Sequence, residues 1–202
     1  LIPRPETEVL VDVALAGVDA ATQNADGEVR VLEVGVGTGC ISLSIATERP
    51  QTRVYATDLS PQAIALATRN RDALALQERV ELIECDLVEG VPAELSQSFS
   101  VLVSNPPYIP TRVLEQEVPA EVKGFEPELA LDGGEDGLDV YRRLLEAAPH
   151  MLLPGGMLCV ELYEGHLDKA AHLAEEQGVW ESVEVKEDMT HRPRILVARL
   201  AK

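Results

Sequence analysis

The sequence predicts an α/β fold in which helices cover both faces of a mostly parallel sheet. Short apolar runs typical of strands alternate with amphipathic helical patterns from end to end, and a glycine-rich turn joins the first strand to the next helix. The chain has 202 residues, of which 46% are hydrophobic, which is enough for one substantial core and short for two. We therefore expect one domain spanning residues 1–202.

The first half of the chain alternates helices with strands. A helical pattern over residues 6–20 follows two prolines, and a helix over 39–47 begins where the glycine-rich turn ends. The helix expected over 61–74 has Ser60 as its cap and Pro61 at its first position. Strands are expected where short runs are rich in valine, isoleucine and leucine, over 29–34, 53–57, 80–83 and 99–103.

Residues 110–135 interrupt this alternation before the second half resumes it. The segment contains three prolines and carries a glycine pair near its end. A loop of this length in a compact domain is usually functional or disordered. The two strands at the end of the chain are joined only by 187–194, so we expect them to pair antiparallel. The remaining elements are expected as helices over 138–148 and 166–177 and strands over 157–162, 182–186 and 195–200.

The charge balance disfavours a nucleic-acid partner. The formal net charge is -18, from 35 acidic and 17 basic residues, and no stretch gathers lysines or arginines into a stripe. Because non-specific nucleic-acid affinity comes chiefly from cations that neutralise phosphates, the chain has little electrostatic means of holding DNA. A solvated acidic surface explains the excess equally well.

Cysteine spacing and hydropathy argue against several other classes of protein. Cys40, Cys85 and Cys159 never fall in a C-x-x-C spacing, and the histidines lack metal-ligand spacing, so we expect neither disulfides nor a metal. No apolar stretch reaches the roughly 18 residues of a membrane span, and no leader with a cleavage site opens the sequence. We therefore expect a cytoplasmic protein without a membrane partner.

The sequence Ser104-Asn105-Pro106-Pro107-Tyr108 directly follows an apolar strand. A double proline cannot continue the interior of a strand, so the chain must turn out of the sheet there. In open α/β sheets ligands bind outside the carboxyl ends of strands, where Asn105 would present a carbonyl and an NH2 group. The prolines have no backbone N–H and leave carbonyls facing the same space. The motif therefore predicts a site rich in acceptors that can hold an NH2 group; its alternative is a rigid β-turn.

The glycine-rich turn is Glu33-Val34-Gly35-Val36-Gly37-Thr38-Gly39. Its glycines let the backbone turn tightly and approach a ligand without side-chain obstruction. The spacing differs from the G-x-G-x-x-G of dinucleotide enzymes, and the lysine of a phosphate-binding P-loop is missing. The turn therefore favours a nucleotide-like ligand without a pyrophosphate; the alternative is a plain tight turn.

Acidic residues end the second and third strands. Asp58 lies 19 residues beyond Gly39, where a carboxylate can accept both hydroxyls of a ribose; alternatively it caps the helix that begins at Pro61. Asp86 suits an adenine amino group, with Leu87 covering the ring, or is a surface carboxylate. Both positions agree with a nucleoside-containing ligand.

Taken together, these features resemble class I S-adenosylmethionine-dependent methyltransferases. The Asn-Pro-Pro-Tyr motif is similar to that of enzymes that methylate planar NH2 nitrogens, namely adenine-N6 DNA methyltransferases and protein-glutamine N5 methyltransferases. Further stretches resemble the HemK/PrmC family, which modifies the glutamine of the GGQ loop in peptide chain release factors. These stretches are Pro3-Arg4-Pro5-Glu6-Thr7-Glu8, F-E-P-E-L-A-L at 125–131, G-G-E-D-G-L at 133–138, and P-G-G at 154–156 leading to Glu161.

The resemblance implies a Rossmann-like sheet of seven strands with an antiparallel last strand. It also implies S-adenosyl-L-methionine as the cofactor and a release factor as the protein partner. The family has a helical domain before the P-R-P segment that recognises the release factor, so we expect this chain, which opens at Leu1, to be the catalytic domain alone. The cofactor contacts that it implies come from Glu33, Gly35, Val36, Gly37, Thr38, Gly39, Asp58, Leu59, Asp86, Leu87 and Asn105.

For the substrate, the resemblance implies binding by Asn105, Pro106, Pro107 and Tyr108. We expect catalytic roles for Asn105, Pro106 and Tyr108: the first two accept the N–H bonds of the amide, and Tyr108 lines the amide plane. Two other functions stay open. An adenine-N6 nucleic-acid methyltransferase would use Asn105 on a flipped base and would need a basic channel beside Tyr108. Alternatively, the chain is a cofactor-binding module without catalysis of its own.

Overall fold

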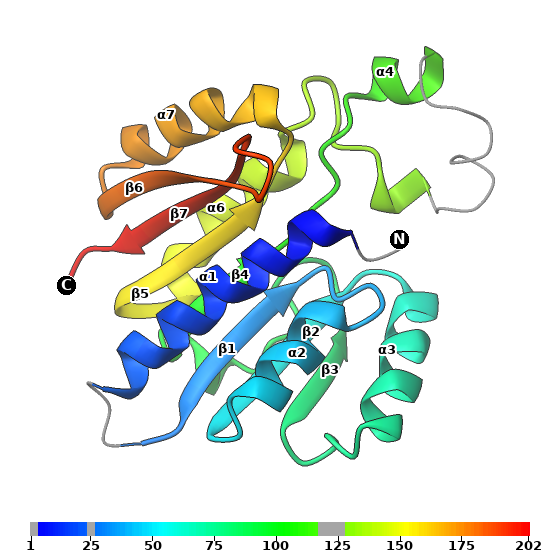
Figure 1. Cartoon of the computed structure of the whole chain (residues 1–202), viewed down its shortest axis with the longest axis vertical. Helices are drawn as coiled ribbons and strands as arrows, with labels where there is room; N and C mark the ends of the chain where they lie inside the picture. The colour runs from blue at the N-terminus through cyan, green and yellow to red at the C-terminus, as the bar shows by residue number, and fades with distance from the viewer. Residues whose placement is uncertain (1–3, 24–26, 117–127) are drawn as a thin grey trace.

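The computed structural model describes residues 4–23, 27–116 and 128–202. It is an α/β sandwich, with one seven-stranded sheet between layers of helices (Figure 1). The α-helices are α1 (Pro5–Thr22), α2 (Cys40–Glu48), α3 (Pro61–Ala73), α4 (Thr111–Gln116), α6 (Asp139–Met151) and α7 (Leu167–Gln177), and the short 3-10 helices are η1 (Ala93–Leu95), η2 (Glu128–Ala130) and η3 (Glu164–His166).

The strand order across the sheet is β3-β2-β1-β4-β5-β7-β6. Every pair is parallel except those made by β7, which runs antiparallel to both β5 and β6 and confirms the expected antiparallel last strand. The strands are β1 (Val29–Val34), β2 (Thr52–Asp58), β3 (Val80–Glu84), β4 (Phe99–Ser104), β5 (Leu152–Glu161), β6 (Trp180–Glu187) and β7 (Pro193–Leu200).

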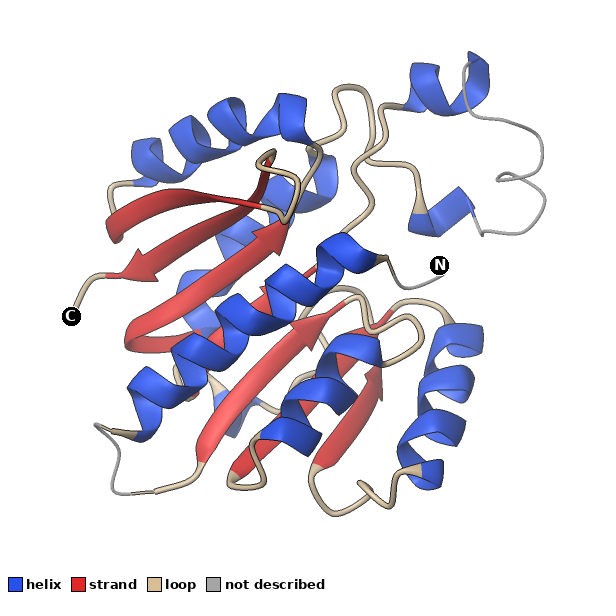
Figure 2. Ribbon diagram, in the orientation of Figure 1, coloured by secondary structure: helices blue, strands red, loops and turns tan. Residues whose placement is uncertain are grey.

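Both faces of the central strands are buried, as is usual for parallel sheets. Because side chains alternate along a strand, Val29 and Val31 of β1 pack into the core on the α1 and α2 face, whereas Leu32 and Val34 pack into the core on the α6 and α7 face. Figure 2 shows α1 and α2 in front of the sheet and α6 behind it. The continuous apolar run of β1 is therefore explained by burial on both sides.

Helix α1 crosses the sheet because its apolar residues fall on one face. Leu10, Ala14 and Val18 are spaced four apart and are all fully buried, and the helix packs against β1, β4 and β5. Its first turn lies at the edge of the sheet where β1 ends (Figure 1). This packing brings the residues that follow Arg4 to the carboxyl ends of the strands.

The order in which the chain adds strands to the sheet reverses between β1 and β4. From β1 the chain proceeds outward through β2 to β3, and then returns to place β4 on the other side of β1. Val34 and Ser104 are paired at the ends of these two strands, so the glycine-rich turn and Asn105 leave the sheet side by side. A crevice at such a switch point is the usual ligand site of an open α/β sheet.

Two parts of the fold differ from the expectation. Strand β5 begins at Leu152 and not at 157, because Gly155 adopts a φ of 79° and the pairing with β4 shifts register between Phe99 and Val101, which lets the strand run through its P-G-G sequence. The segment 110–135, expected to be a loop, contains α4 and η2.

Two signature stretches are only partly described. Pro3 of the P-R-P-E-T-E stretch, and residues 125–127 of the F-E-P-E-L-A-L stretch, lie outside the described residues. Within the described ranges, none of the helices combines the length and apolar character needed to cross a bilayer.

The packing of α1 predicts the effect of truncating its buried face. Leu10→Ala should lower the free energy of unfolding by about 2 to 5 kcal/mol, because a buried leucine loses both its transfer energy and its packing contacts. Leu74→Ala is the control, since Leu74 is 54% exposed and its loss should cost no more than about 0.5 kcal/mol. Urea unfolding followed by circular dichroism measures both. Equal losses would contradict the placement of α1.

Candidate active site

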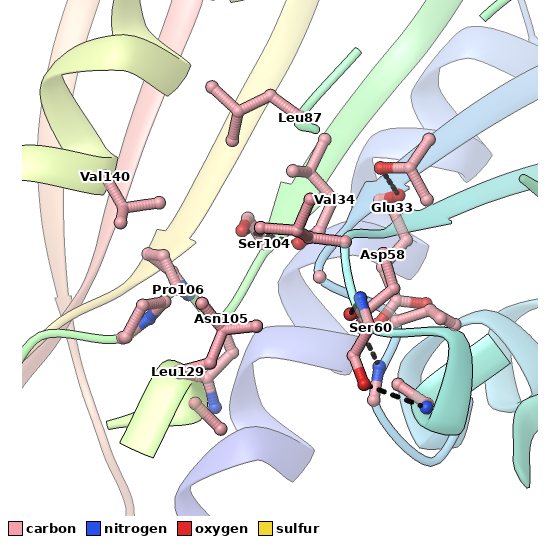
Figure 3. A pocket seen from close by; sticks show the side chains of 18 of the residues that line it. Glu33, Val34, Asp58, Ser60, Leu87, Ser104, Asn105, Pro106, Leu129 and Val140 are labelled. Carbon is pink, nitrogen blue, oxygen red and sulfur yellow. Dashed lines mark hydrogen bonds between the residues drawn. The ribbon is translucent and has the colours of Figure 1, made fainter. Parts of the chain in front are cut away.

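A cavity of about 460 Å³ opens at the switch point of the sheet. The turn after β1 and the carboxyl ends of β2, β3 and β4 form its walls, and residues of η2 and α6 also line it. Figure 3 shows Asn105 and Pro106 on one side of this cavity, and Asp58 and Ser60 on the other. The chain thus brings into one cavity the separate stretches that the sequence had singled out.

The glycine-rich turn has the backbone that its sequence predicts. Gly35 and Gly37 have φ values of 84° and 54°, in the left-handed region that favours glycine, and a Cβ added at either would meet no atom within 4 Å. The N–H groups of Gly35 and Val36 both donate to the Thr57 carbonyl at 2.9 Å. The turn is therefore tied to the end of β2 and leaves open space for a ligand.

Glu33 lies beneath this turn and is 1% exposed. Its Oε2 accepts hydrogen bonds from the backbone N–H of Ser42, at 2.9 Å, and from the Ser42 hydroxyl, so the carboxyl group ties β1 to the first turn of α2. Burial raises the pKa of Glu33 to about 8, against the opposing effect of the two Ser42 hydrogen bonds. Glu33 borders the cavity, and its cofactor contact stays a prediction.

Asp58 ends β2 with both carboxylate oxygens already bonded. Oδ2 accepts from the N–H of Gly37 at 2.9 Å, and Oδ1 accepts from the N–H of Ser60 at 2.8 Å. The capping role belongs to Ser60, whose Oγ accepts from the N–H of Ala63 at 3.3 Å (Figure 3). Asp58 lines the cavity, and each of its oxygens can accept a second hydrogen bond, so the carboxylate is held in place and remains able to bind hydroxyls.

Asp86 and Leu87 line the cavity beyond the end of β3, and Leu59 lines it beyond β2. Asp86 Oδ2 accepts from Nη2 of Arg143 at 2.8 Å, an ion pair that the sequence reasoning missed because it joins residues 57 positions apart. Leu87 has a φ of 45°, an uncommon backbone for a non-glycine residue. Asp86 is thus paired with a residue of α6 at the cavity wall, and its contact to adenine stays a prediction.

Asn105 follows β4 directly and lies in the wall of the cavity. The hydroxyl of Ser104 donates to the Val34 carbonyl at 2.7 Å, which joins the end of β4 to the end of β1. The Nδ2 of Asn105 donates to Oγ1 of Thr7 at 3.4 Å, and Thr7 Oγ1 donates to Oε2 of Glu161 at 2.9 Å. The sequence did not predict that Thr7 contacts Asn105 and Glu161, although Thr7 lies in a stretch that carries the family resemblance.

Ile109, which follows the Asn-Pro-Pro-Tyr motif, forms backbone hydrogen bonds with the end of the 110–135 segment. Ile109 donates to the Leu131 carbonyl at 3.0 Å and accepts from the N–H of Gly133 at 2.8 Å. This pairing places Leu129 and Ala130 of η2 in the wall of the cavity. Leu129 is 55% exposed, so an apolar side chain stands at the cavity wall with much of its surface open to solvent.

Two of the expected site residues do not line the cavity. Gly39 has a φ of 82° at the N-terminus of α2, where an added Cβ would meet Leu43 at 3.0 Å, so it serves the close packing of the helix. Tyr108 packs in part against the hydrophobic core, and burial, followed by the charge of Glu161, raises the pKa of its hydroxyl. Val36, Thr38, Pro106 and Pro107 do line the cavity, as expected.

The pKa of Glu33 predicts a pH dependence of stability. A carboxyl group whose folded pKa is raised from 4.5 to about 8 stabilises the fold fully below the lower value, and this contribution is lost as the pH rises through the higher one. In the unsubstituted chain this titration should lower the unfolding free energy by on the order of a few kcal/mol between about pH 5 and about pH 9. Glu33→Gln should remove this part of the decrease.

Urea unfolding at several pH values measures this difference. The exposed Glu181→Gln is the control and should keep the profile of the unsubstituted protein. Identical profiles for Glu33→Gln and the unsubstituted chain would contradict a buried neutral acid at this position.

The chain is similar in sequence to known methyltransferases. The methyltransferase small domain family matches residues 12–122. A release factor glutamine methyltransferase of Clostridium acetobutylicum is 37% identical over 201 residues, which cover 98% of this chain and 67% of the relative. One of Geobacter sulfurreducens is 46% identical over 168 residues, which cover 83% of this chain and 55% of the relative. The match thus spans between about half and two thirds of these relatives.

Solved structures share the fold. The crystal structure of a methyltransferase from Pyrococcus furiosus superposes with a TM-score of 0.69 at 20% sequence identity, covering 100% of this chain and 85% of that one. The sheet and its neighbours therefore identify the fold as that of class I methyltransferases, whose cofactor is S-adenosyl-L-methionine. With a family match over more than half of its length and close relatives over nearly all of it, the chain belongs to the release factor glutamine methyltransferase family.

Proposed function

We propose that this chain transfers a methyl group from S-adenosyl-L-methionine to the N5 nitrogen of a glutamine side chain, in the GGQ motif of a peptide chain release factor. The orientation of Asn105 supports the proposal most strongly. Its NH2 group bonds to Thr7, which leaves its carbonyl oxygen to face the cavity as a hydrogen-bond acceptor. A release factor substrate would place the reaction in the cytoplasm.

The cavity offers the groups needed to hold the cofactor. Asp58 has an acceptor site free on each oxygen for the ribose hydroxyls, and Asp86 would accept from the adenine amino group, with Leu87 against the ring. The turn at Gly35 and Gly37 leaves room for close approach of the ligand to the backbone. When bound, the cofactor supplies a methyl group on a positively charged sulfur.

The chain's own contribution to the reaction is to orient the amide. An amide nitrogen is a poor nucleophile because its lone pair is delocalised into the carbonyl. Asn105 Oδ1 and the Pro106 carbonyl would each accept one N–H bond of the substrate and so fix the nitrogen in the attacking geometry. Such positioning can supply on the order of 7 to 11 kcal/mol. No side-chain base is needed before transfer: the bond from sulfur to the methyl carbon breaks as the bond from nitrogen to that carbon forms, and the nitrogen then loses one of its two protons to water.

Charge near the motif favours a protein substrate over a nucleic acid. The groups that act on Tyr108 are the acids Glu6 and Glu161 and the bases Arg4 and Arg194, so opposite charges are balanced where a DNA methyltransferase would need a basic channel. The net charge of -18 works in the same direction. The relatives from Clostridium acetobutylicum and Geobacter sulfurreducens are named for glutamine methylation.

Two substitutions should separate binding from methyl transfer. Asn105→Ala should lower the rate of methyl transfer by about 100- to 1000-fold, because a preorganised polar contact to the reacting group is removed, and should weaken S-adenosyl-L-methionine binding far less than the loss of Asp58 does. Asp58→Ala should instead weaken cofactor binding. Calorimetry gives the affinities, and transfer of a radiolabelled methyl group to a GGQ-containing release factor domain gives the rates.

The site of modification completes the test. Mass spectrometry should locate a gain of one methylene group on the GGQ glutamine after incubation with the unsubstituted chain. Full activity of Asn105→Ala at saturating cofactor would overturn the proposed role of Asn105, and methylation of DNA adenine in place of glutamine would overturn the proposed substrate.

A further inference from the structure

A chain of hydrogen bonds connects the side chain of Asn105 to a buried carboxyl group. Asn105 Nδ2 lies 3.4 Å from Thr7 Oγ1, and Thr7 Oγ1 lies 2.9 Å from Glu161 Oε2. The three residues come from the end of β4, the first turn of α1 and the end of β5, and are 98 and 154 positions apart in the sequence. Thr7 is 6% exposed and Glu161 is 1% exposed, so water competes little for the bond between them, whereas the Asn105–Thr7 bond at the cavity wall is partly buried.

Because the Thr7 hydroxyl has a single proton, the series of hydrogen bonds from Asn105 to Glu161 can run in only one direction when Glu161 is ionised. An ionised carboxylate can only accept hydrogen bonds, so Thr7 must give its proton to Glu161. The oxygen of Thr7 can then only accept from Asn105, and the NH2 is the donating end of that side chain. With the amide reversed, two acceptors would face each other in a partly buried place, which is costly. The ionised Glu161 thus selects which end of Asn105 faces the cavity.

Surrounding elements hold Glu161 in place. The backbone N–H of the next residue, Leu162, donates to the Arg194 carbonyl at 2.9 Å, which ties the end of β5 to β7. The charged and titratable groups that act on the carboxyl group are Arg4 and Glu6 of the α1 terminus and Arg194 of β7, and Glu161 in turn acts on Tyr108 after β4. The proposed function uses these groups only for their balance of charge, and the methyl-transfer step itself gives Glu161 no role.

We propose that Thr7 and Glu161 are positioning residues that lock Asn105 with its amide oxygen toward the substrate. The catalytic consequence of this lock rests on the proposed function, whereas the orientation itself does not. Neither residue needs to touch the reacting atoms. Both residues disfavour the orientation of Asn105 in which the NH2 group faces the cavity.

Protonation of Glu161 would release the lock. A neutral carboxyl group can donate to Thr7, whose own proton is then free to bond to the oxygen of Asn105 and turn the NH2 group toward the cavity. Burial raises the pKa of Glu161 above its ordinary value, although the Thr7 hydrogen bond and Arg194 oppose the effect. The lock therefore holds at high pH and is lost as the pH falls through this raised pKa.

Kinetics of conservative variants test the catalytic consequence. Thr7→Val keeps the shape of the side chain but removes the hydroxyl, and should lower kcat by about 10- to 100-fold while the Kd for S-adenosyl-L-methionine changes less than about twofold. Thr7→Ser restores the hydroxyl and should restore most of kcat. Equal activity of Thr7→Val and the unsubstituted chain, or failure of serine to rescue, would overturn the proposal.

Nuclear magnetic resonance without substrate tests the orientation independently. The side-chain amide of Asn105, identified by its loss in Asn105→Ala, should shift as the pH passes through the pKa of Glu161 and should show contacts to the Thr7 side chain. The shift should vanish in Glu161→Gln and persist in Glu6→Gln, the control for a nearby carboxylate. An Asn105 amide that does not titrate, or a shift that follows Glu6, would refute the lock.

The two experiments distinguish the lock from the proposed function. If the unsubstituted chain fails to methylate a GGQ glutamine while the Asn105 amide titrates with Glu161, the lock stands and the proposed substrate fails. If the chain methylates the glutamine but Thr7→Val is fully active, the function stands and the lock fails.

Discussion

The parallel pairing of β1 with β4 is the constraint on which the rest of the site depends. It sets Val34 beside Ser104, and the Ser104 hydroxyl reinforces the junction by donating to the Val34 carbonyl. The two loops that leave these strands therefore diverge from one point, the glycine-rich turn toward β2 and the Asn-Pro-Pro-Tyr segment toward η2. Under the proposed function, a cofactor bound at the first loop would lie next to a substrate bound at the second.

Asn105, Pro106 and Pro107 present hydrogen-bond acceptors to the cavity. Pro106 and Pro107 have no N–H to offer, and the NH2 of Asn105 is bonded to Thr7. Thr7 reaches this place only because α1 packs its apolar stripe, beginning at Leu10, across β4 and β5. Helix α1 thus both covers one face of the sheet and supplies Thr7, the hydrogen-bond partner of Asn105 at the carboxyl end of the strands.

Local sequence predicted the fold and part of the site. The sheet, its antiparallel last strand and the gathering of Gly35, Asp58 and Asn105 followed from patterns within a few residues. The Thr7–Glu161 contact could not be predicted, because it depends on how elements far apart in sequence pack. Tyr108 and Gly39 show the limit of motif membership: it predicts ligand contacts, but neither residue is among those that line the cavity, and core packing and helix packing determine their positions. The start of β5 was missed because its Gly155 bulge imitates a turn.

A crystal structure of this chain with S-adenosyl-L-homocysteine and a GGQ-containing peptide tests the central claim most directly. The account predicts that the glutamine nitrogen lies about 2.7 to 3.2 Å from both Asn105 Oδ1 and the Pro106 carbonyl, with its free face toward the sulfur. It also predicts that Asn105 Nδ2 remains bonded to Thr7. A glutamine bound elsewhere, or an Asn105 whose NH2 group faces the substrate, would contradict the account.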